Sequence, residues 1–242
     1  MALYRAEGVV LRRWKLGEAD RIIVFATAEH GKVRAVARGV RKTKAKLAGK
    51  LDPPAHVALQ LYETRGDLDI VTQVETINRF DGLRNDFNRL VRSMAMLEAA
   101  EHVMQEREPD PHTFTMLVRA LDTLSNKPSP LVMAGFMLKL MSLGGLEPFI
   151  DGCVLCEEEK PSEELVAFDI GEGGTLCTSC RRGRAITPDA LEILRLMLGG
   201  QLGQALQITD SPAVHEVDHL AVEIVEYHIE RRLKSLAVLG QT

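Results

Sequence analysis

The chain has 242 residues, of which 45% are hydrophobic and 26% charged, the proportions of an ordinary globular protein. Its longest uncharged apolar run, residues 131–138, is too short to cross a bilayer. The N-terminus lacks the charge-then-apolar order of a secretory signal, so we expect a cytoplasmic protein with no membrane segment.

Charge is distributed unevenly along the chain. Residues 1–50 hold thirteen Lys/Arg and four Asp/Glu, a net of 13 − 4 = +9. Residues 51–242 hold seventeen and thirty, a net of 17 − 30 = −13, and the two values sum to the net charge of −4. A basic first fifth followed by an acidic remainder predicts one surface for polyanions and other surfaces for different partners.

The first eighty residues predict β-structure. Short runs rich in Val, Ile and Leu, several alternating polar with apolar residues, are separated by Gly, Pro and Asp turn signals. Five short strands without a helix-length segment are typical of a small closed barrel such as the OB-fold, which binds nucleic acid. The predicted strands are residues 6–14, 20–28, 32–38, 55–63 and 67–76.

A basic run covers residues 34–50, with seven Lys/Arg and no acidic residue. Such side chains release counterions from phosphates and bind nucleic acid without reading its sequence. A solvated basic loop is the alternative for each of them. Trp14 is the best candidate for base stacking among few aromatic residues. The predicted DNA-contacting residues are Arg12, Arg13, Trp14, Lys15, Arg34, Arg38, Arg41, Lys42, Lys44 and Lys46.

From about residue 83 the apolar period changes from two to 3.6, which predicts helices. Proline after Ser or Thr is typical of a helix start, and Gly-Gly pairs indicate helix ends. The predicted helices cover residues 83–106, 112–124, 130–143, 188–198 and 213–236.

All four cysteines lie in two CxxC pairs twenty residues apart: Cys153, Cys156, Cys177 and Cys180. Two such turns place four thiolates around one point, as tetrahedral Zn²⁺ requires. Four protein ligands leave no open position, so the pattern predicts a structural zinc site. Disulfides and a redox CxxC are weaker interpretations in a chain of this length without a signal peptide. Arg181, Arg182 and Arg184 form a second basic cluster that either contacts phosphate or is solvated.

The last predicted helix contains His215-Glu216-Val217-Asp218-His219, a literal HExxH pattern. In metalloproteases the two histidines bind zinc and the glutamate is the general base. Such a site needs a third protein ligand, and after Glu230 no acidic residue or histidine follows. A zinc-dependent hydrolase is therefore kept only as an alternative, and no other enzyme motif is visible. We expect a non-enzymatic protein.

Several motifs together resemble the RecO family of bacterial recombination mediators and DNA-repair proteins. They are residues 7–11 (EGVVL), 17–20 (GEAD), 27–32 (TAEHGK), 37–42 (ARGVRK), 143–148 (LGGLEP) before the first cysteine, and 227–236 (YHIERRLKSL). Their order and spacing cover nearly the whole chain.

The resemblance implies an α+β protein with an OB-fold barrel in residues 1–80 and a helical domain in residues 81–242, which carries a zinc module in residues 148–184. It also implies binding of single- and double-stranded DNA, annealing of complementary strands, and work with RecR to load RecA onto strands covered by single-strand-binding protein (SSB). The acidic C-terminal tail of SSB is expected to contact the helical domain. A bacterial, nucleoid-associated location follows, and a structural adaptor without DNA binding of its own remains an alternative.

Overall fold

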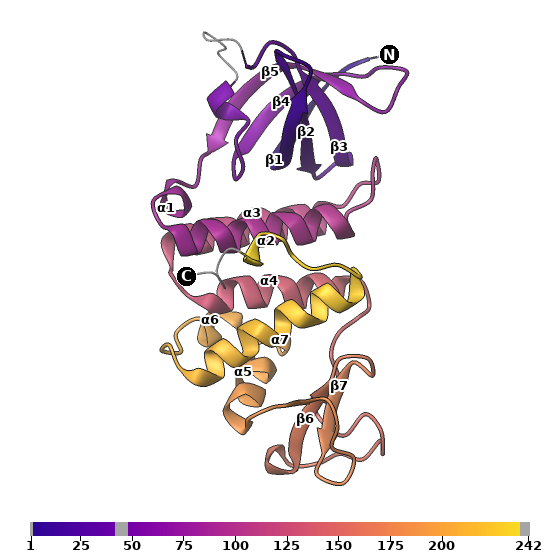
Figure 1. The fold of residues 1–242 in the computed structure, drawn as a ribbon, viewed down its shortest axis with the longest axis vertical. Helices are drawn as coiled ribbons and strands as arrows, with labels where there is room; N and C mark the ends of the chain where they lie inside the picture. Colours follow the sequence, from indigo (N-terminus) through magenta and orange to yellow (C-terminus); the bar gives the residue numbers. More distant parts are fainter. Residues whose placement is uncertain (1, 42–47, 238–242) are drawn as a thin grey trace. The chain divides into compact units, whose positions relative to one another are not determined.

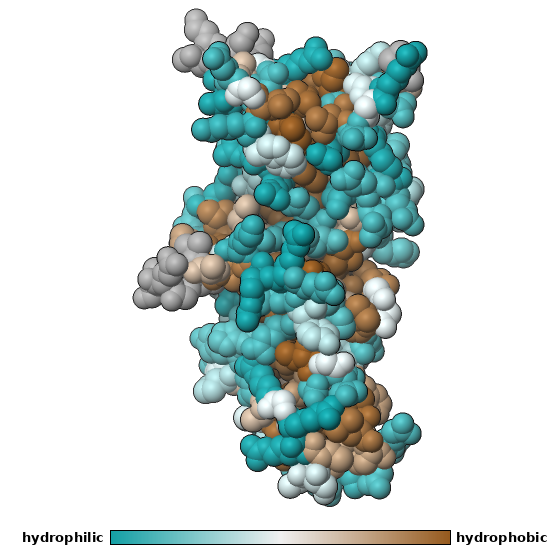
Figure 2. Space-filling view, turned by 45° about the vertical axis from the view of Figure 1, so that its right-hand side comes forward, coloured by the Kyte–Doolittle hydropathy of each residue, from teal (hydrophilic) through white to brown (hydrophobic). Residues whose placement is uncertain are grey.

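The computed structural model describes residues 2–41 and 48–237. The chain forms two compact units, one of Met1–Lys127 with Leu233–Thr242 and one of Pro128–Arg232. Figure 1 shows their elements, and the two units are described separately below. On the face drawn in Figure 2, hydrophilic residues cover most of the surface, with hydrophobic residues gathered in smaller areas between them.

The first unit begins with the five predicted strands, which close into a barrel in the order β1-β2-β3-β5-β4. All neighbours pair antiparallel except β3 and β5, whose short parallel pairing closes the barrel. The OB-like barrel predicted from alternation is thus confirmed. The strands are β1 Leu3–Leu16, β2 Asp20–Thr27, β3 Gly31–Ala37, β4 His56–Tyr62 and β5 Asp69–Asn78, with a 3-10 turn η1 at Ala48–Lys50.

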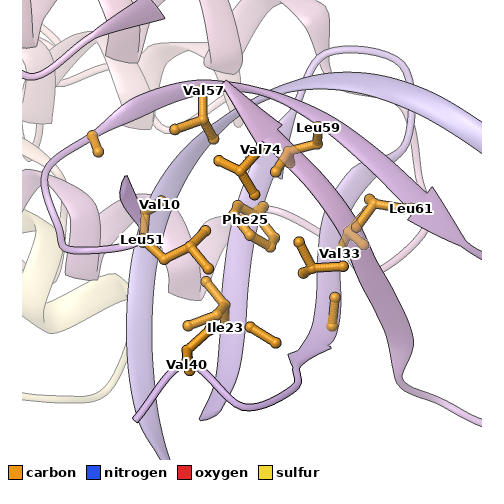
Figure 3. Close-up of a cluster of buried hydrophobic side chains, with 14 residues drawn as sticks. Val10, Ile23, Phe25, Val33, Val40, Leu51, Val57, Leu59, Leu61 and Val74 are labelled. Carbon is orange, nitrogen blue, oxygen red and sulfur yellow. The ribbon is translucent and has the colours of Figure 1, made fainter. Parts of the chain in front are cut away.

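Alternating apolar residues fill the barrel, as the side-chain period of two requires. In β3 every second residue from Gly31 to Ala37 is buried. Phe25 of β2 lies near the centre of the cluster, with Val33 and Leu61 to one side of it and Ile23 below it (Figure 3). Leu51, just after η1, joins the same cluster, so the segment that follows the basic run is anchored in the core.

Three helices follow the barrel in this unit: α1 Asp81–Arg84, α2 Phe87–Val103 and α3 Pro111–Asn126. The prediction of one helix over residues 83–106 is wrong at both ends. Asp86 lies in extended backbone and its carboxylate accepts from the Arg89 N–H at 3.0 Å, which starts a new helix. Met104 is extended and ends α2. The predicted helix over residues 112–124 is confirmed.

The segment after α2 attaches to the start of β3. The Lys32 N–H donates to the Gln105 carbonyl at 3.0 Å, and the Arg107 N–H donates to the Lys32 carbonyl at 3.1 Å. Arg107 also donates to the buried Asp69 carboxylate at 2.8 Å, and Tyr4 donates its hydroxyl to the same carboxylate. These bonds fix the α2–α3 connection to the barrel.

The second unit contains α4 Pro130–Leu143, η2 Ser162–Glu164, β6 Leu165–Asp169, β7 Gly174–Cys177, β8 Arg184–Ala185, α5 Pro188–Leu198, α6 Leu202–Ala205 and α7 Pro212–His228. Most of α4 is buried, and it packs against α7. The three short strands form a separate sheet in the order β7-β6-β8. The predicted helices over residues 130–143 and 188–198 have the observed bounds.

The last helix is shorter than the predicted residues 213–236. It ends at His228, and Glu230 takes a left-handed φ of 53°, which turns the chain. Leu233 is then buried in the first unit, where Glu98 of α2 accepts from the N–H groups of Lys234 at 3.1 Å and Ser235 at 3.0 Å. Within the described residues no helix has both the length and the apolar character to span a membrane.

Candidate nucleic-acid interface and metal centre

Two of the predicted DNA-contacting arginines contact acidic residues, one within α2 and one just after it. Strand register places Arg12, Val24 and Arg34 in one row across β1, β2 and β3. Arg12 forms an ion pair with Glu101 at 3.5 Å, and Arg34 approaches Glu106 at 3.9 Å. Their charge is therefore partly neutralised within the unit.

A second pair of basic residues converges on one carboxylate. Arg13 of β1 and Arg21 of β2 both form ion pairs with Asp52, which follows η1, and the Arg21 contact is 3.4 Å. One aspartate cannot neutralise two guanidinium groups, so a positive charge remains here. Even so, Arg13 is held in an internal contact that a phosphate would have to compete with.

Three predicted residues are exposed and form no ion pair with any described residue: Lys15, Arg38 and Arg41. We call them the basic end of the barrel; the β1–β2 turn beside them also carries exposed Glu18, and it is followed by Asp20, whose carboxylate accepts from the Gly39 N–H at 2.7 Å. Arg41 donates its side chain to the Gly17 carbonyl at 2.9 Å and its backbone N–H to the Ala19 carbonyl at 2.9 Å. These bonds tie the residues after β3 to the β1–β2 turn, so the three charges are presented by connected segments.

Trp14 is half-buried beside this end, and the Arg12 guanidinium lies 5.5 Å from its ring centroid. A cation over the ring occupies one face that a base would need for stacking. The remaining predicted residues, Lys42, Lys44 and Lys46, lie outside the described part of the chain.

The four cysteine sulfurs of the second unit come together as predicted. Every Sγ lies within 4.8 Å of the others, and those of Cys156 and Cys177 are 4.0 Å apart. Tetrahedral Zn²⁺ with bonds of about 2.3 Å would need sulfurs about 3.8 Å apart. The four thiols are thus close enough to hold a metal ion after a small contraction.

Local backbone turns build this cluster. The Glu157 N–H donates to the Cys153 carbonyl at 2.9 Å, and the Cys180 N–H donates to the Cys177 carbonyl at 3.1 Å. Gly152 lies just before the first turn. The position favours glycine, because a Cβ there would lie 2.8 Å from the Glu158 carbonyl oxygen. Each CxxC therefore curls its two thiols toward the same point.

The thiol pKa values reflect this crowding. Burial raises the pKa of Cys153, but N–H groups of Cys156, Cys177 and Leu155 outweigh burial and lower it to about 6. Hydrogen bonds to Cys153 and Cys177, together with burial, raise the pKa of Cys180 to about 12. Four neighbouring thiols cannot all ionise without a cation, so the donor set fits a divalent metal.

Two of the three arginines after the last cysteine form ion pairs within the second unit. Arg182 forms ion pairs with Asp169 at 2.7 Å and Glu172 at 2.5 Å, and Arg184 pairs with Glu223 at 2.8 Å. These contacts favour a structural role for both side chains over phosphate binding.

The HExxH residues do not form a metal site. The Glu216 carboxylate accepts from the Thr187 N–H at 2.9 Å and from its hydroxyl at 2.7 Å, at the start of α5. His215 contacts Asp210 at 2.9 Å, and His219 is exposed. Within the described residues, the four cysteines are the one group whose donor atoms gather closely enough to bind a metal.

Sequence patterns gave no sign of the acidic partners Asp52, Glu101 and Glu106. They lie 31 to 89 residues away from the arginines they contact, and strand register with helix packing brings them together. Nothing in the local sequence distinguishes a paired arginine from a free one.

Comparison with protein-family models gives two adjacent matches. Residues 1–80 match the model described as "Recombination protein O N terminal", and residues 84–237 match "Recombination protein O C terminal". Together they cover nearly the whole chain, and the boundary between them follows the last strand of the barrel. The chain therefore belongs to the recombination protein O (RecO) family, whose role is in DNA repair and recombination.

Proposed function

We propose that the chain is a non-enzymatic mediator that binds single- and double-stranded DNA and anneals complementary strands. The observation that carries the proposal is the basic end of an OB-like barrel, Lys15, Arg38 and Arg41, in a chain of the RecO family. We propose that Lys42, Lys44 and Lys46 contact DNA as well, while Arg12, Arg13 and Arg34 contribute less because acidic residues already contact them.

The mechanism is electrostatic. Two DNA strands repel each other through their phosphates, and a basic surface screens both strands and raises their local concentration. Base pairing then supplies the sequence specificity. Because no covalent bond is made or broken, annealing requires no catalytic residue and no nucleotide hydrolysis.

Family membership supports a proposal about the partners. We propose that the chain acts with RecR to help load RecA onto SSB-coated single strands, and that the acidic SSB tail contacts its helical part, in the bacterial cytoplasm at the nucleoid. The family-model boundaries at residues 80 and 84 support a functional division into a barrel, residues 1–80, and a helical domain, residues 81–242, with the module of residues 148–184.

Binding measurements on two triple variants test the DNA site. Replacing Lys15, Arg38 and Arg41 by Ala should lower affinity for a single-stranded oligonucleotide and reduce the log–log salt slope by about 2, since each lost phosphate contact removes about 0.7. The matched control replaces Arg12, Arg13 and Arg34, which removes the same number of charges from paired positions. Equal losses in the two variants would contradict the assignment. No binding by the intact wild-type chain would favour the adaptor alternative.

We further propose that the metal is zinc and that its role is structural. Four thiolates select soft tetrahedral ions and leave no open position for water. The cysteines would hold the ion and so fix the two turns and the β6–β7 hairpin between them. Metal analysis of the purified chain should find about one zinc per chain, and Cys177→Ser should abolish it while the barrel stays folded. Another metal, or none, would overturn this part.

A further inference from the structure

The segment that leads into and through the first CxxC turn is strongly acidic. Residues 147–164 contain seven acidic residues and one lysine, a net of 1 − 7 = −6. Two of the seven are paired with basic residues: Glu158 with Lys160 at 2.5 Å and Asp151 with Arg195 at 3.4 Å. All seven are exposed: Glu147, Asp151, Glu157, Glu158, Glu159, Glu163 and Glu164.

Apolar side chains are exposed along the same segment. Leu146, Phe149 and Leu155 are 43%, 47% and 40% exposed. The backbone of Phe149 is fixed beside β7, because its N–H donates to the Gly173 carbonyl and its carbonyl accepts from the Thr175 N–H, both at 2.9 Å. Fixed apolar groups among solvated carboxylates are typical of a docking surface.

The charge determines what this surface can accept. Carboxylates repel DNA phosphates and would equally repel an acidic peptide such as the proposed SSB tail. A suitable partner has Lys or Arg side chains around a bulky apolar one. Electrostatic complementarity of this kind steers association and fixes its register.

The chain itself carries such a surface. At the basic end of the barrel, Lys15, Arg38 and Arg41 are exposed without an ion-pair partner among the described residues, and Leu16 beside them is 38% exposed. With Glu18 of the β1–β2 turn and the adjoining Asp20 counted, the barrel end keeps a net of 3 − 2 = +1. The two surfaces are therefore opposite in charge, and each has an exposed apolar group. We propose that the basic barrel end of one chain docks on the acidic, apolar face of the zinc module of a second copy.

This pairing has a regulatory consequence, which rests on the proposed DNA-binding function. The same three basic residues would bind either the second copy or DNA. Single-stranded DNA therefore competes with self-association, and chains not bound to DNA keep their basic ends covered. Because the contact is small and charged, it is weak and sensitive to salt.

Sedimentation velocity of the full zinc-loaded chain over a range of concentrations tests the pairing. We expect concentration-dependent self-association at about 50 mM NaCl that disappears at about 500 mM NaCl. Replacing Glu147, Glu159 and Glu163 by Gln should weaken it at least about tenfold, and Phe149→Ser should weaken it as well. The matched control neutralises three exposed acidic residues of the barrel, Glu29→Gln, Asp67→Asn and Glu75→Gln, and should associate like the wild type.

Charge exchange provides the specific test. A chain with Lys15, Arg38 and Arg41 changed to Glu should not self-associate, nor should one with Glu147, Glu159 and Glu163 changed to Lys, but a mixture of the two should associate. A wild-type chain that is monomeric at every concentration would overturn the proposal. Self-association that is abolished by Phe149→Ser but unaffected by salt and by the charge variants would also overturn it. The contact would then join two apolar faces. If self-association holds but DNA neither binds nor disrupts it, the proposed DNA function fails and the docking contact stands.

Discussion

The attachment of the α2–α3 connection to the barrel depends on glycine at position 31. Gly31 has a φ of +58°, and a Cβ built there would lie 1.9 Å from the Glu108 carbonyl oxygen and 2.9 Å from that of Gln105. Gly17 has nearly the same φ, +55°, but a Cβ there meets no atom within 4 Å. The two glycines share a backbone conformation and differ only in their surroundings.

Comparing alanine substitutions at the two positions should therefore separate the cost of the left-handed backbone from the cost of the steric clash. The left-handed backbone costs an L-residue about 1 kcal/mol, and both variants bear this cost. Gly31→Ala must also push the Glu108 carbonyl away by about 1 Å, which would strain or break the two bonds that join Lys32 to Gln105 and Arg107, worth about 1 kcal/mol each. We expect the free energy of unfolding to fall by about 3 kcal/mol in Gly31→Ala and by about 1 kcal/mol in Gly17→Ala.

Urea unfolding followed by tryptophan fluorescence measures the difference, because the chain's one tryptophan, Trp14, lies in β1 and reports on this unit alone. Equal destabilisation by the two substitutions would refute the reasoning, since it would mean that the connection moves away at no cost. Urea m-values should stay equal, which confirms that the denatured states are comparable.

The remaining predictions concern the buried carboxylate, the metal and the α5 cap. Burial opposes ionisation of Asp69, but hydrogen bonds from Arg107 and Tyr4 hold its pKa below the ordinary 3.8. The ionised carboxylate therefore stabilises the fold above pH 3.8, and this contribution is lost as the pH falls through the lower pKa of the folded state. Asp69→Asn should lower the free energy of unfolding by about 2 kcal/mol and remove this contribution to its pH dependence in an acid titration. Chelation of the metal should expose the module to proteolysis without changing Trp14 fluorescence, and loss of the fluorescence signal would show that the barrel depends on the ion. Glu216→Ala should lower the stability of the second unit by about 1 kcal/mol, as removal of a helix cap does, and any hydrolytic activity lost with it would contradict the capping role.

Local patterns located the elements well where the signal is short-range. Alternation predicted five strands, because a barrel strand has one buried face. Proline at the first helical position predicted the starts of α4 and α5, because its fixed φ and missing N–H suit only that position. The spacing of the cysteines predicted their convergence, because each CxxC turn needs only its own residues to form.

Predicted helix lengths were less accurate. Residues 83–106 keep a helical period through Asn85 and Asp86, yet the Asp86 side chain caps a new helix there. The apolar pattern of the last predicted helix continues to residue 236. The chain nevertheless turns at Glu230, and Leu233 is buried against other elements. In each case a competing local cap or a distant packing contact outweighs continued helix formation.

The sequence by itself determined the barrel, the helical remainder, the cysteine cluster and the sign of charge in each part, since these depend on residue type and spacing. Only the tertiary structure decided which basic residues remain available. Arg12, Arg13 and Arg34 are paired with acidic residues from other segments, while Lys15, Arg38 and Arg41 are not paired with any described residue. The physical reason is that an ion pair forms only within a few ångströms, and strand register and helix packing, rather than nearness in sequence, set those distances.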